Sequence, residues 1–536
     1  MIPPVDQILS GTARYWLLGG ILLGFFLLKL TFNPYPVGDF GRDGSYYYQV
    51  ARHVSEGDGL LTSVSLYHQG LKKLPHPSTI YPLWPLMLGG VGAVIGLDKA
   101  ASLLPKIFYF IDLILLYILT NTIAQTWGKT AVIVFRQGRI LDVGHLVVML
   151  MGINHNFFLI TSLPFTEALA FCLTVTALLL LIRSSKEPRI LWGVGAGALA
   201  ALAYLTRSQM FGLVTFIPVS LLLIGLKEQK YRQIAVAAAL TGMVLILVWV
   251  FYLLKVVGHF TPRMLLDFEA YHETPELPPY SSRIPIQSFS GFIKDLIYGS
   301  LVAFNPNNPF SYVRSFGMSV YLIPLAALYL LAHPEALRRT LQHITSRTSL
   351  SVVGTLSGAV GCLIGVHAFH QASPPPWLFH FRHGLPIILV IAVAMGYLLA
   401  QDSQILRFFV LFLIMWSLVT SAGELKKKMR ISYEGPTKAQ QELAVWIAEQ
   451  KVPPVFVTTR PWALGALTRG LFHGVKCNQP ATQTILYFQY VNVNYLITHS
   501  FDDNCRFFTG VKQNLKPIRE FGNGSDKIIV WRYQSD

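Results

Sequence analysis

The chain has 536 residues, of which 53% are hydrophobic and 13% charged, with a mean hydropathy of +0.47 and a formal net charge of +16. This composition excludes an ordinary soluble protein and indicates a polytopic α-helical membrane protein. The basic residues stand in small groups between apolar runs, as positive-inside topology requires, so we do not expect nucleic acid as a partner.

Apolar runs of bilayer length recur through the first 423 residues. The run at about 15–32 is too long for a cleaved signal peptide and lacks its small-residue exit, so it predicts a first transmembrane helix. Further runs lie at about 103–124, 140–160, 166–182, 190–206, 210–226, 234–254, 318–331, 351–369, 385–400 and 405–420. Together they predict about eleven spans.

The run at 81–97 contains two prolines and four glycines, and its assignment decides the topology. If it does not span, the basic clusters around Arg136, Arg183, Lys230 and Arg338 all fall on the cytoplasmic side. If it spans, two of these clusters lie outside. We therefore expect a juxtamembrane or re-entrant helix at 81–97.

This topology divides the chain into a transmembrane module, residues 1–424, and an extracytoplasmic C-terminal domain, residues 425–536. The N-terminus is then cytoplasmic, and two outer loops, 33–102 and 255–317, face the same side as the C-terminal domain. In the tail a helical pattern at 437–449 precedes the strand-like runs PVFVTT, VNYLITH and DKIIVWRY. This alternation predicts a small α/β domain, which either is a structural cap or contacts a binding partner of the protein.

Two of the four cysteines, Cys172 and Cys362, lie in apolar runs and are expected to pack there. The other two, Cys477 and Cys505, lie in the C-terminal domain and can pair if that domain is extracytoplasmic. The sequence has no C-x-x-C motif, which argues against a structural zinc site.

The first outer loop begins with a short amphipathic helix. Apolar residues including Tyr46 and Tyr47 fall on one face, polar residues such as Arg52 fall on the other, and glycines at 57 and 59 end the pattern. This pattern predicts a helix that lies on the membrane surface. At its N-terminal edge Asp43 is suited to act as a general base, or else to cap the helix. Asp39 is the rival candidate for the base.

Three more ionisable residues, Glu167, Arg207 and Arg382, fall at the outer ends of spans, where such groups are expensive and often functional. Glu167 either complements the dipole of the helix that it opens or binds a divalent ion or a sugar hydroxyl. The two arginines are suited to a phosphate group, unless they are interfacial residues that extend their side chains to water. The shared side predicts a single site.

Further candidates for substrate contacts lie close to these groups in the sequence. His76 and Tyr81, in LPHPSTIYPLWP, frame a proline-rich approach to the 81–97 helix, and His383 follows Arg382. Tyr47 lies one helical turn from Asp43. A single histidine in a loop is more often simply solvated, so His76 is the weaker candidate.

Several of these motifs together resemble the GT-C membrane glycosyltransferases, especially bacterial relatives of dolichyl-phosphate-mannose protein mannosyltransferases and the lipid A aminoarabinose transferase. The resemblance rests on D-x-x-Y-Y-Y-x-x-A-R from Asp43, the YPLWPL run, PFTEALAF at Glu167, LAYLTRSQ at Arg207 and FHFRHGLPIIL at Arg382. These motifs occur in the family's order, and the similar region covers about residues 14–420.

The resemblance implies transfer of a sugar from a polyprenyl-phosphate donor to a glycolipid, polysaccharide or protein acceptor, outside a bacterial inner membrane. Asp43 then matches the family's catalytic acid, and Arg207 and Arg382 match contacts to the donor phosphate. A metal requirement stays open: Mg²⁺ or Mn²⁺ would be held by Asp43 and Glu167. Many relatives have a second acid where this chain has Gly44, and Pro-Glu where it has Ser208-Gln209.

Two other functions remain open from the sequence. A lipid or solute transporter or flippase would place its charges at the bilayer midplane, often in two related halves. A polymerase or ligase for lipid-linked oligosaccharides would share the fold and differ in the length of its donor. The clustering of charges at one membrane face favours the glycosyltransferase.

Overall fold

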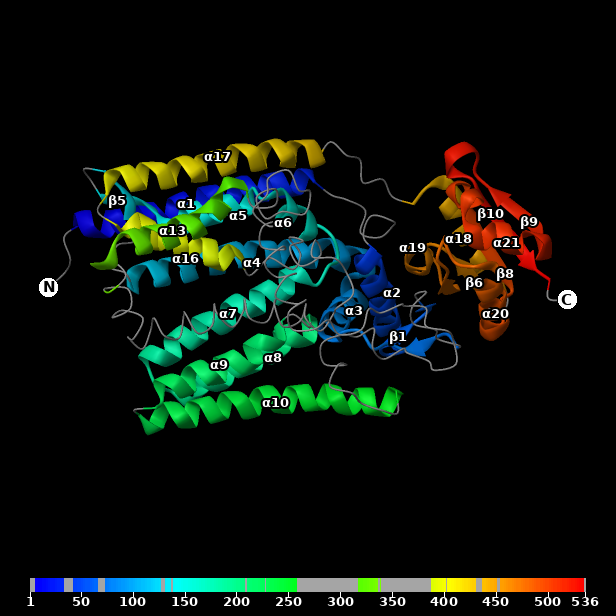
Figure 1. Ribbon diagram of the computed structural model, residues 1–536, viewed down its shortest axis with the longest axis horizontal. Helices are drawn as coiled ribbons and strands as arrows, with labels where there is room; N and C mark the ends of the chain where they lie inside the picture. Colours follow the sequence, from blue (N-terminus) through cyan, green and yellow to red (C-terminus); the bar gives the residue numbers. More distant parts are fainter. Residues whose placement is uncertain are drawn as a thin grey trace.

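The computed structural model describes residues 5–32, 42–65, 73–126, 131–135, 138–207, 210–226, 228–257, 317–335, 338, 387–401, 403–429, 436–450 and 454–534. Asp39, Arg382 and His383 lie outside the described residues, as do most of the second outer loop and the predicted span at 351–369. The long helices run roughly parallel to the longest axis (Figure 1). Helices α2 (Arg42–Glu56) and α3 (Leu83–Ile95) lie at the end of the bundle opposite the N-terminus, and the C-terminal domain lies beyond them.

Among the described residues, five helices are long and apolar enough to cross a membrane. They are α1 (Val5–Thr31), α4 (Leu97–Thr126), α7 (Glu167–Lys186), α10 (Gln229–Val257) and α17 (Gln404–Met429). Shorter apolar helices complete the described bundle: α3 (Leu83–Ile95), α5 (Val143–Gly152), α8 (Ile190–Thr206), α9 (Phe211–Ile224), α13 (Leu322–Ala332), which follows η5 (Gly317–Tyr321), and α16 (Ile387–Ala400). The chain is thus an integral membrane protein, and the count of about eleven spans stays a prediction.

The predicted span at 140–160 is wrong as a single helix. Its first residues belong to β5 (Gly138–Asp142), which pairs antiparallel with β4 (Ala131–Phe135). Helix α5 follows, and α6 (His155–Ile160) then begins anew. The side chain of Asn154 accepts hydrogen bonds from the backbone N–H groups of Asn156 and Phe157, at 3.1 and 2.9 Å. This N-cap interrupts the helix inside an apolar run, where hydropathy alone gives no signal.

Helices α8 and α10 approach closely through two glycines spaced four residues apart. A Cβ atom on Gly193 would clash with Ile234, and one on Gly197 would clash with the backbone of Ala238. Small residues at this spacing let helix backbones meet, which is the main source of packing between helices in lipid. This contact fixes α8, whose C-terminal end carries Arg207.

The C-terminal domain contains a six-stranded sheet covered by helices. Five of its strands are β6 (Val455–Thr458), β7 (Leu471–Gly474), β8 (Tyr495–His499), β9 (Leu515–Phe521) and β10 (Ile528–Tyr533), and the sixth is β2 (Val64–Ser65). The strand order is β2-β7-β6-β8-β10-β9. The pairs β2–β7, β7–β6 and β6–β8 are parallel, and β10 is antiparallel to β8 and β9. Its helices are α18 (Lys438–Ala448), α19 (Pro461–Leu467), α20 (Ala481–Val491) and α21 (Arg506–Val511), and short 3₁₀ turns are η7 (Ser500–Asn504), η8 (Lys512–Asn514) and η9 (Gly524–Asp526). The three strand-like runs predicted in the tail contain β6, β8 and β10.

The edge strand of this sheet comes from the first outer loop. Strand β2 (Val64–Ser65) pairs with β7, more than 400 residues later in the chain, and the backbone N–H of Phe472 donates to the carbonyl of Ser63 at 2.9 Å. Gly465 lies so close to Val64 that a Cβ atom there would clash with it. Nearby, β1 (Leu61–Thr62) pairs with β3 (His76–Pro77). The first outer loop and the C-terminal domain therefore share one folded unit.

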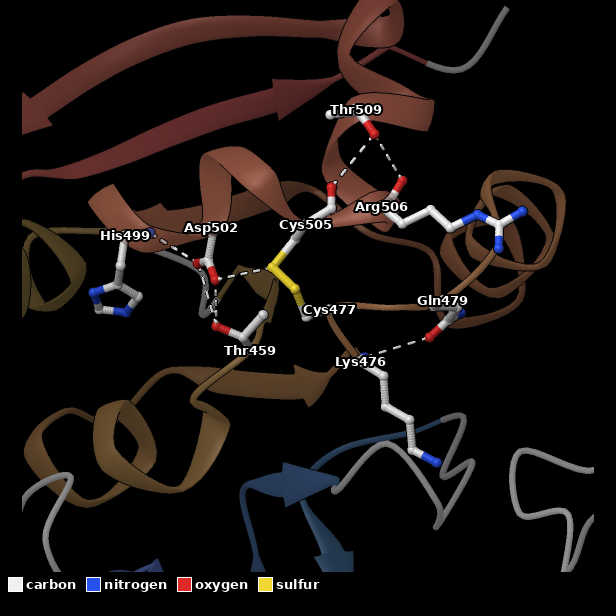
Figure 2. The surroundings of a disulfide bond; sticks show 9 residues. All are labelled: Thr459, Lys476, Cys477, Gln479, His499, Asp502, Cys505, Arg506 and Thr509. Atoms are coloured by element: carbon white, nitrogen blue, oxygen red, sulfur yellow. Dashed lines mark hydrogen bonds between the residues drawn. A yellow bond between two sulfur atoms is a disulfide. The ribbon is translucent and has the colours of Figure 1, made fainter.

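Cys477 and Cys505 form a disulfide bond, with sulfur atoms 2.15 Å apart, so the pairing that the sequence left open is present. Figure 2 shows Asp502 beside it. The buried carboxylate of Asp502 accepts hydrogen bonds from the hydroxyl of Thr459 at 3.0 Å and from the backbone N–H of His499 at 2.9 Å. The disulfide and this network join the loop after β7 to the loop after β8.

Two histidines of the sheet, His473 in β7 and His499 in β8, make the stability of the domain depend on pH. Burial lowers the pKa of each imidazole to about 4, below its ordinary value of 6.5. Because the unfolded chain takes up these protons first, the free energy of unfolding falls as the pH drops from about 6.5 towards 4, by about 3 kcal/mol for His473. Above pH 6.5 this contribution is complete.

We expect His473→Phe to reduce this acid sensitivity. The measurement is the midpoint of thermal unfolding of the purified protein at pH 7.5 and pH 5, for the wild type and the variant. The phenyl ring cannot take up a proton, so the shift between the two pH values shrinks and the remainder reports His499. An equal shift in both proteins would contradict the assignment.

Candidate functional site

The segment that connects α6 to α7 lies at the end of the bundle where α2 packs, and it is held from three sides. From α1, Lys29 donates hydrogen bonds to the hydroxyl of Thr161, at 2.9 Å, and to the carbonyl of Phe158. From α3, the indole N–H of Trp84 donates to the carbonyl of Pro164 at 2.9 Å. From α2 (Arg42–Glu56), Gly44 lies beside Pro164, where an added Cβ atom would make an ordinary van der Waals contact at 3.5 Å. These contacts fix the position of the segment relative to α1, α2 and α3.

Asp43 lies in the first turn of α2, next to Gly44, and its side chain is partly exposed. The positive end of the helix dipole favours a carboxylate at this position. Tyr47, one turn later, is half-buried and packs against both the transmembrane module and the C-terminal domain. The contact of Gly44 with Pro164 thus places the first turn of α2, which carries Asp43, beside the connection between α6 and α7. Pro164 itself lies three residues before Glu167.

Glu167 and Arg207 form a buried ion pair. The carboxylate of Glu167 is fully buried at the start of α7, and the guanidinium of Arg207, 12% exposed at the C-terminal end of α8, lies 2.9 Å from it. The same Nη1 atom donates to the hydroxyl of Thr166 at 3.2 Å. The pair joins α7 to α8, and the Arg207 side chain keeps a small exposed fraction. The carboxylate of Glu167 therefore interacts favourably both with the dipole of α7 and with the guanidinium of Arg207.

Tyr81 extends the site along α8. Its buried ring packs edge-to-face on the buried ring of Tyr204, with centroids 5.6 Å apart, three residues before Arg207. His76 lies in β3, where its Nδ1 atom is 2.7 Å from the carbonyl of Pro77. The structure thus brings Tyr81 close to Arg207 through the packing of the two tyrosines.

The C-terminal domain holds the other end of α2. The guanidinium of Arg52 donates hydrogen bonds to the carbonyls of Gly465, at 2.8 Å, and Ala466, at 3.2 Å, at the end of α19. Glu56 forms an ion pair with Arg469 at 2.8 Å. Burial lowers the pKa of the Arg52 guanidinium, while the nearby carboxylate of Glu56 raises it. The sequence placed Arg52 on the polar face of α2 without identifying this partner.

The residues at the site fit a divalent metal ion poorly. Glu167 already pairs with Arg207, so a cation would have to compete with the guanidinium. Among the described residues, a cluster of possible ligands is formed by His53, Glu56 and Asp58. Both nitrogens of His53 are engaged, with Asp58 at 3.0 Å and a serine hydroxyl at 2.6 Å, and Glu56 pairs with an arginine. The sequence left a metal requirement open, and these contacts do not decide it.

The first turn of α2 carries Asp43, and the adjoining ends of α7 and α8 carry the Glu167–Arg207 pair, with Tyr81 packed one turn away on α8. His76 pairs with β1 in the loop that follows α2, and the candidates Asp39, Arg382 and His383 lie outside the described residues. Sequence reasoning missed Lys29 and Trp84, which hold the segment between α6 and α7. A lysine within an apolar span was the available signal for Lys29, since such a charge needs a partner.

Solved structures of membrane glycosyltransferases share this fold, although no protein-family model and no curated protein matches the sequence. ArnT from Cupriavidus metallidurans, bound to undecaprenyl phosphate, aligns with a TM-score of 0.53 and 12% identity over 96% of this chain and 97% of that chain. An Archaeoglobus fulgidus oligosaccharyltransferase tethered to an acceptor peptide aligns with a TM-score of 0.51 and 11% identity, over 97% and 74%. The arabinofuranosyltransferase AftD from Mycobacteria aligns with a TM-score of 0.54 and 12% identity, over 98% of this chain and 40% of that one.

All three enzymes belong to the GT-C superfamily, although one is bound to a lipid phosphate and another to an acceptor peptide. At identities of 11–12%, the likeness shows the fold of the chain and does not identify its substrate. The alignment with ArnT runs through nearly the whole of both chains, the C-terminal domain included. This chain therefore has the fold of the GT-C membrane glycosyltransferases, the superfamily that its motifs resemble.

Proposed function

We propose that the protein is an integral-membrane glycosyltransferase that moves a sugar from a polyprenyl-phosphate donor to an acceptor on the extracytoplasmic face. The observation that carries the proposal is the gathering of Asp43 and the Glu167–Arg207 pair at one end of a GT-C fold. Such an arrangement sets a base and a cation on either side of a sugar whose bond to phosphate is to be broken.

In the proposed reaction Asp43 accepts the proton of the acceptor hydroxyl as its oxygen attacks the anomeric carbon of the sugar. The bond from that carbon to the phosphate oxygen breaks, and polyprenyl phosphate leaves with the electron pair. Arg207 stabilises the charge that develops on the phosphate, because its guanidinium remains partly exposed beside Glu167. Tyr81 and Tyr47 are proposed to line the sugar.

The orientation follows from the charges at the two ends of the bundle. The basic residues Arg183, Lys186 and Arg232 lie at the ends of α7 and α10 that face away from Asp43, where the positive-inside rule places the cytoplasm. A disulfide in the C-terminal domain suits an oxidising compartment. We infer that Asp43 and the C-terminal domain lie outside an inner membrane, with the N-terminus inside.

Turnover of a synthetic donor tests this function. Purified protein in detergent, given labelled sugars on polyprenyl phosphate, is expected to release free polyprenyl phosphate, and faster when an envelope lipid or glycan extract is added as acceptor. Heat-unfolded protein is the control. Failure of folded protein to consume any of a series of hexose and pentose donors, with acceptor extract present, would contradict the proposal.

A further inference from the structure

Helix α2 touches both the candidate site and the C-terminal domain. Its first turn carries Asp43, and Arg52 follows nine residues later, about 13 Å along the helix axis. One face of α2 packs on α3, where Gly89 lies so close to Ala51 and Val54 that a Cβ atom would clash. The helix is continuous over these residues, so a displacement at Arg52 is transmitted to Asp43.

Helix α2 also contacts α19 of the C-terminal domain, through Arg52. Arg52 donates to two successive carbonyls, those of Gly465 and Ala466, which are among the last acceptors of α19. The forked guanidinium suits two neighbouring acceptors, and a cation at the C-terminal end of a helix is favoured by the dipole. Removal of this side chain would leave both carbonyls without the donor that they have here.

Apolar packing surrounds this contact, since Tyr46 and Val50 of α2 lie in one buried cluster with Leu464 of α19. A pocket of about 470 Å³ opens beside Arg52, between α18, α19 and α2, with walls that include Ile447, Leu467 and Arg469. The pair of Arg469 with Glu56 at its rim is largely exposed, with 80% of the arginine side chain accessible, and such pairs contribute little. The half-buried Arg52 is therefore the better shielded of these two polar links to the C-terminal domain.

We propose that Arg52 is a positioning residue, which fastens α2 to the C-terminal domain and so holds Asp43 against the segment that connects α6 to α7. The role as a base rests on the proposed function, whereas the mechanical coupling does not. In this view the C-terminal domain is part of the catalytic unit. Its edge strand β2 and Arg52 together fix the helix that carries the base.

The test compares Arg52→Met with Arg52→Lys and with the matched control Arg469→Gln, all as full-length protein in detergent. Methionine keeps the aliphatic packing and loses both hydrogen bonds. We expect the kcat for sugar transfer to fall by about tenfold to a hundredfold, because a shift of about 1 Å in a reacting group has effects of this size. The KM for the donor should change by less than about twofold.

Arg52→Lys is expected to recover most of the lost kcat, since an ammonium group still reaches the carbonyls, although without the forked geometry. Arg469→Gln should stay within about twofold of the wild type. A lower melting temperature for Arg52→Met with an unchanged kcat on the folded fraction would overturn the proposal and leave Arg52 a purely structural residue. Equal losses in Arg52→Met and Arg469→Gln would overturn it as well.

Hydrogen exchange separates this proposal from the proposed function. In Arg52→Met the amides of α2 should exchange faster than in the wild type, while those of α20 and β8 keep their rates. This result is expected even if no donor is ever turned over, because it reports the coupling alone. Unchanged exchange in α2 would show that the contact with α19 does not hold the helix, whatever the enzyme transfers.

Discussion

Asp43→Asn is expected to lower the rate of sugar transfer by about a hundredfold to ten-thousandfold while the protein still folds and inserts. The amide keeps the size and polarity of the side chain, so the first turn of α2 and its approach to the segment between α6 and α7 are preserved. It cannot accept the proton of the acceptor hydroxyl, and general-base catalysis contributes an effect of this order. The measurement is release of polyprenyl phosphate at saturating donor.

The control for this variant is Asp98→Asn. Asp98 is an exposed carboxylate in the first turn of α4. It accepts a hydrogen bond from the hydroxyl of Tyr48, which lies on α2 together with Asp43. We expect its loss to change transfer by no more than a few fold. Retained activity in Asp43→Asn together with loss in Asp39→Asn would move the base to Asp39.

Glu167→Gln is expected to destabilise the protein by about 3 kcal/mol. The substitution keeps the volume of the side chain and leaves the guanidinium of Arg207 without its carboxylate, at a site where the acid is fully buried. Breaking one partner of a buried pair costs about 3–5 kcal/mol, because an uncompensated charge remains; the 12% exposure of Arg207 places the value at the lower end.

A double-mutant cycle isolates the pair. Arg207→Gln with Glu167→Gln should be more stable than either single variant, since no charge is left unpaired. The measurement is unfolding by SDS in mixed micelles.

Glu187→Gln is the matched control, because Glu187 pairs with Arg183 at the other end of α7, at 3.4 Å and with both side chains about half exposed. We expect less than about 0.5 kcal/mol there. Additive effects of Glu167 and Arg207 would refute the buried pair.

The membrane class and the shared side of the charged residues could be predicted from the sequence. Apolar runs need no partner to be recognised, because the bilayer itself is the solvent that selects them. Loop charges then set the side on which Asp43, Glu167 and Arg207 emerge. Strands β6, β8 and β10 of the C-terminal domain were also predictable, since their β-branched and aromatic runs are local signals, whereas β7 and β9 were missed.

Tertiary structure decided which of these residues are partners. The sequence could not show that Glu167 belongs to Arg207, 40 residues later, or that Arg52 belongs to the end of α19, more than 400 residues later. Ion pairs and hydrogen bonds depend on where the side chains meet in space, and the sequence records only their chemical types. The two-residue strand β2 carries no periodicity, so its place at the sheet edge is set by the packing of Val64 on Gly465.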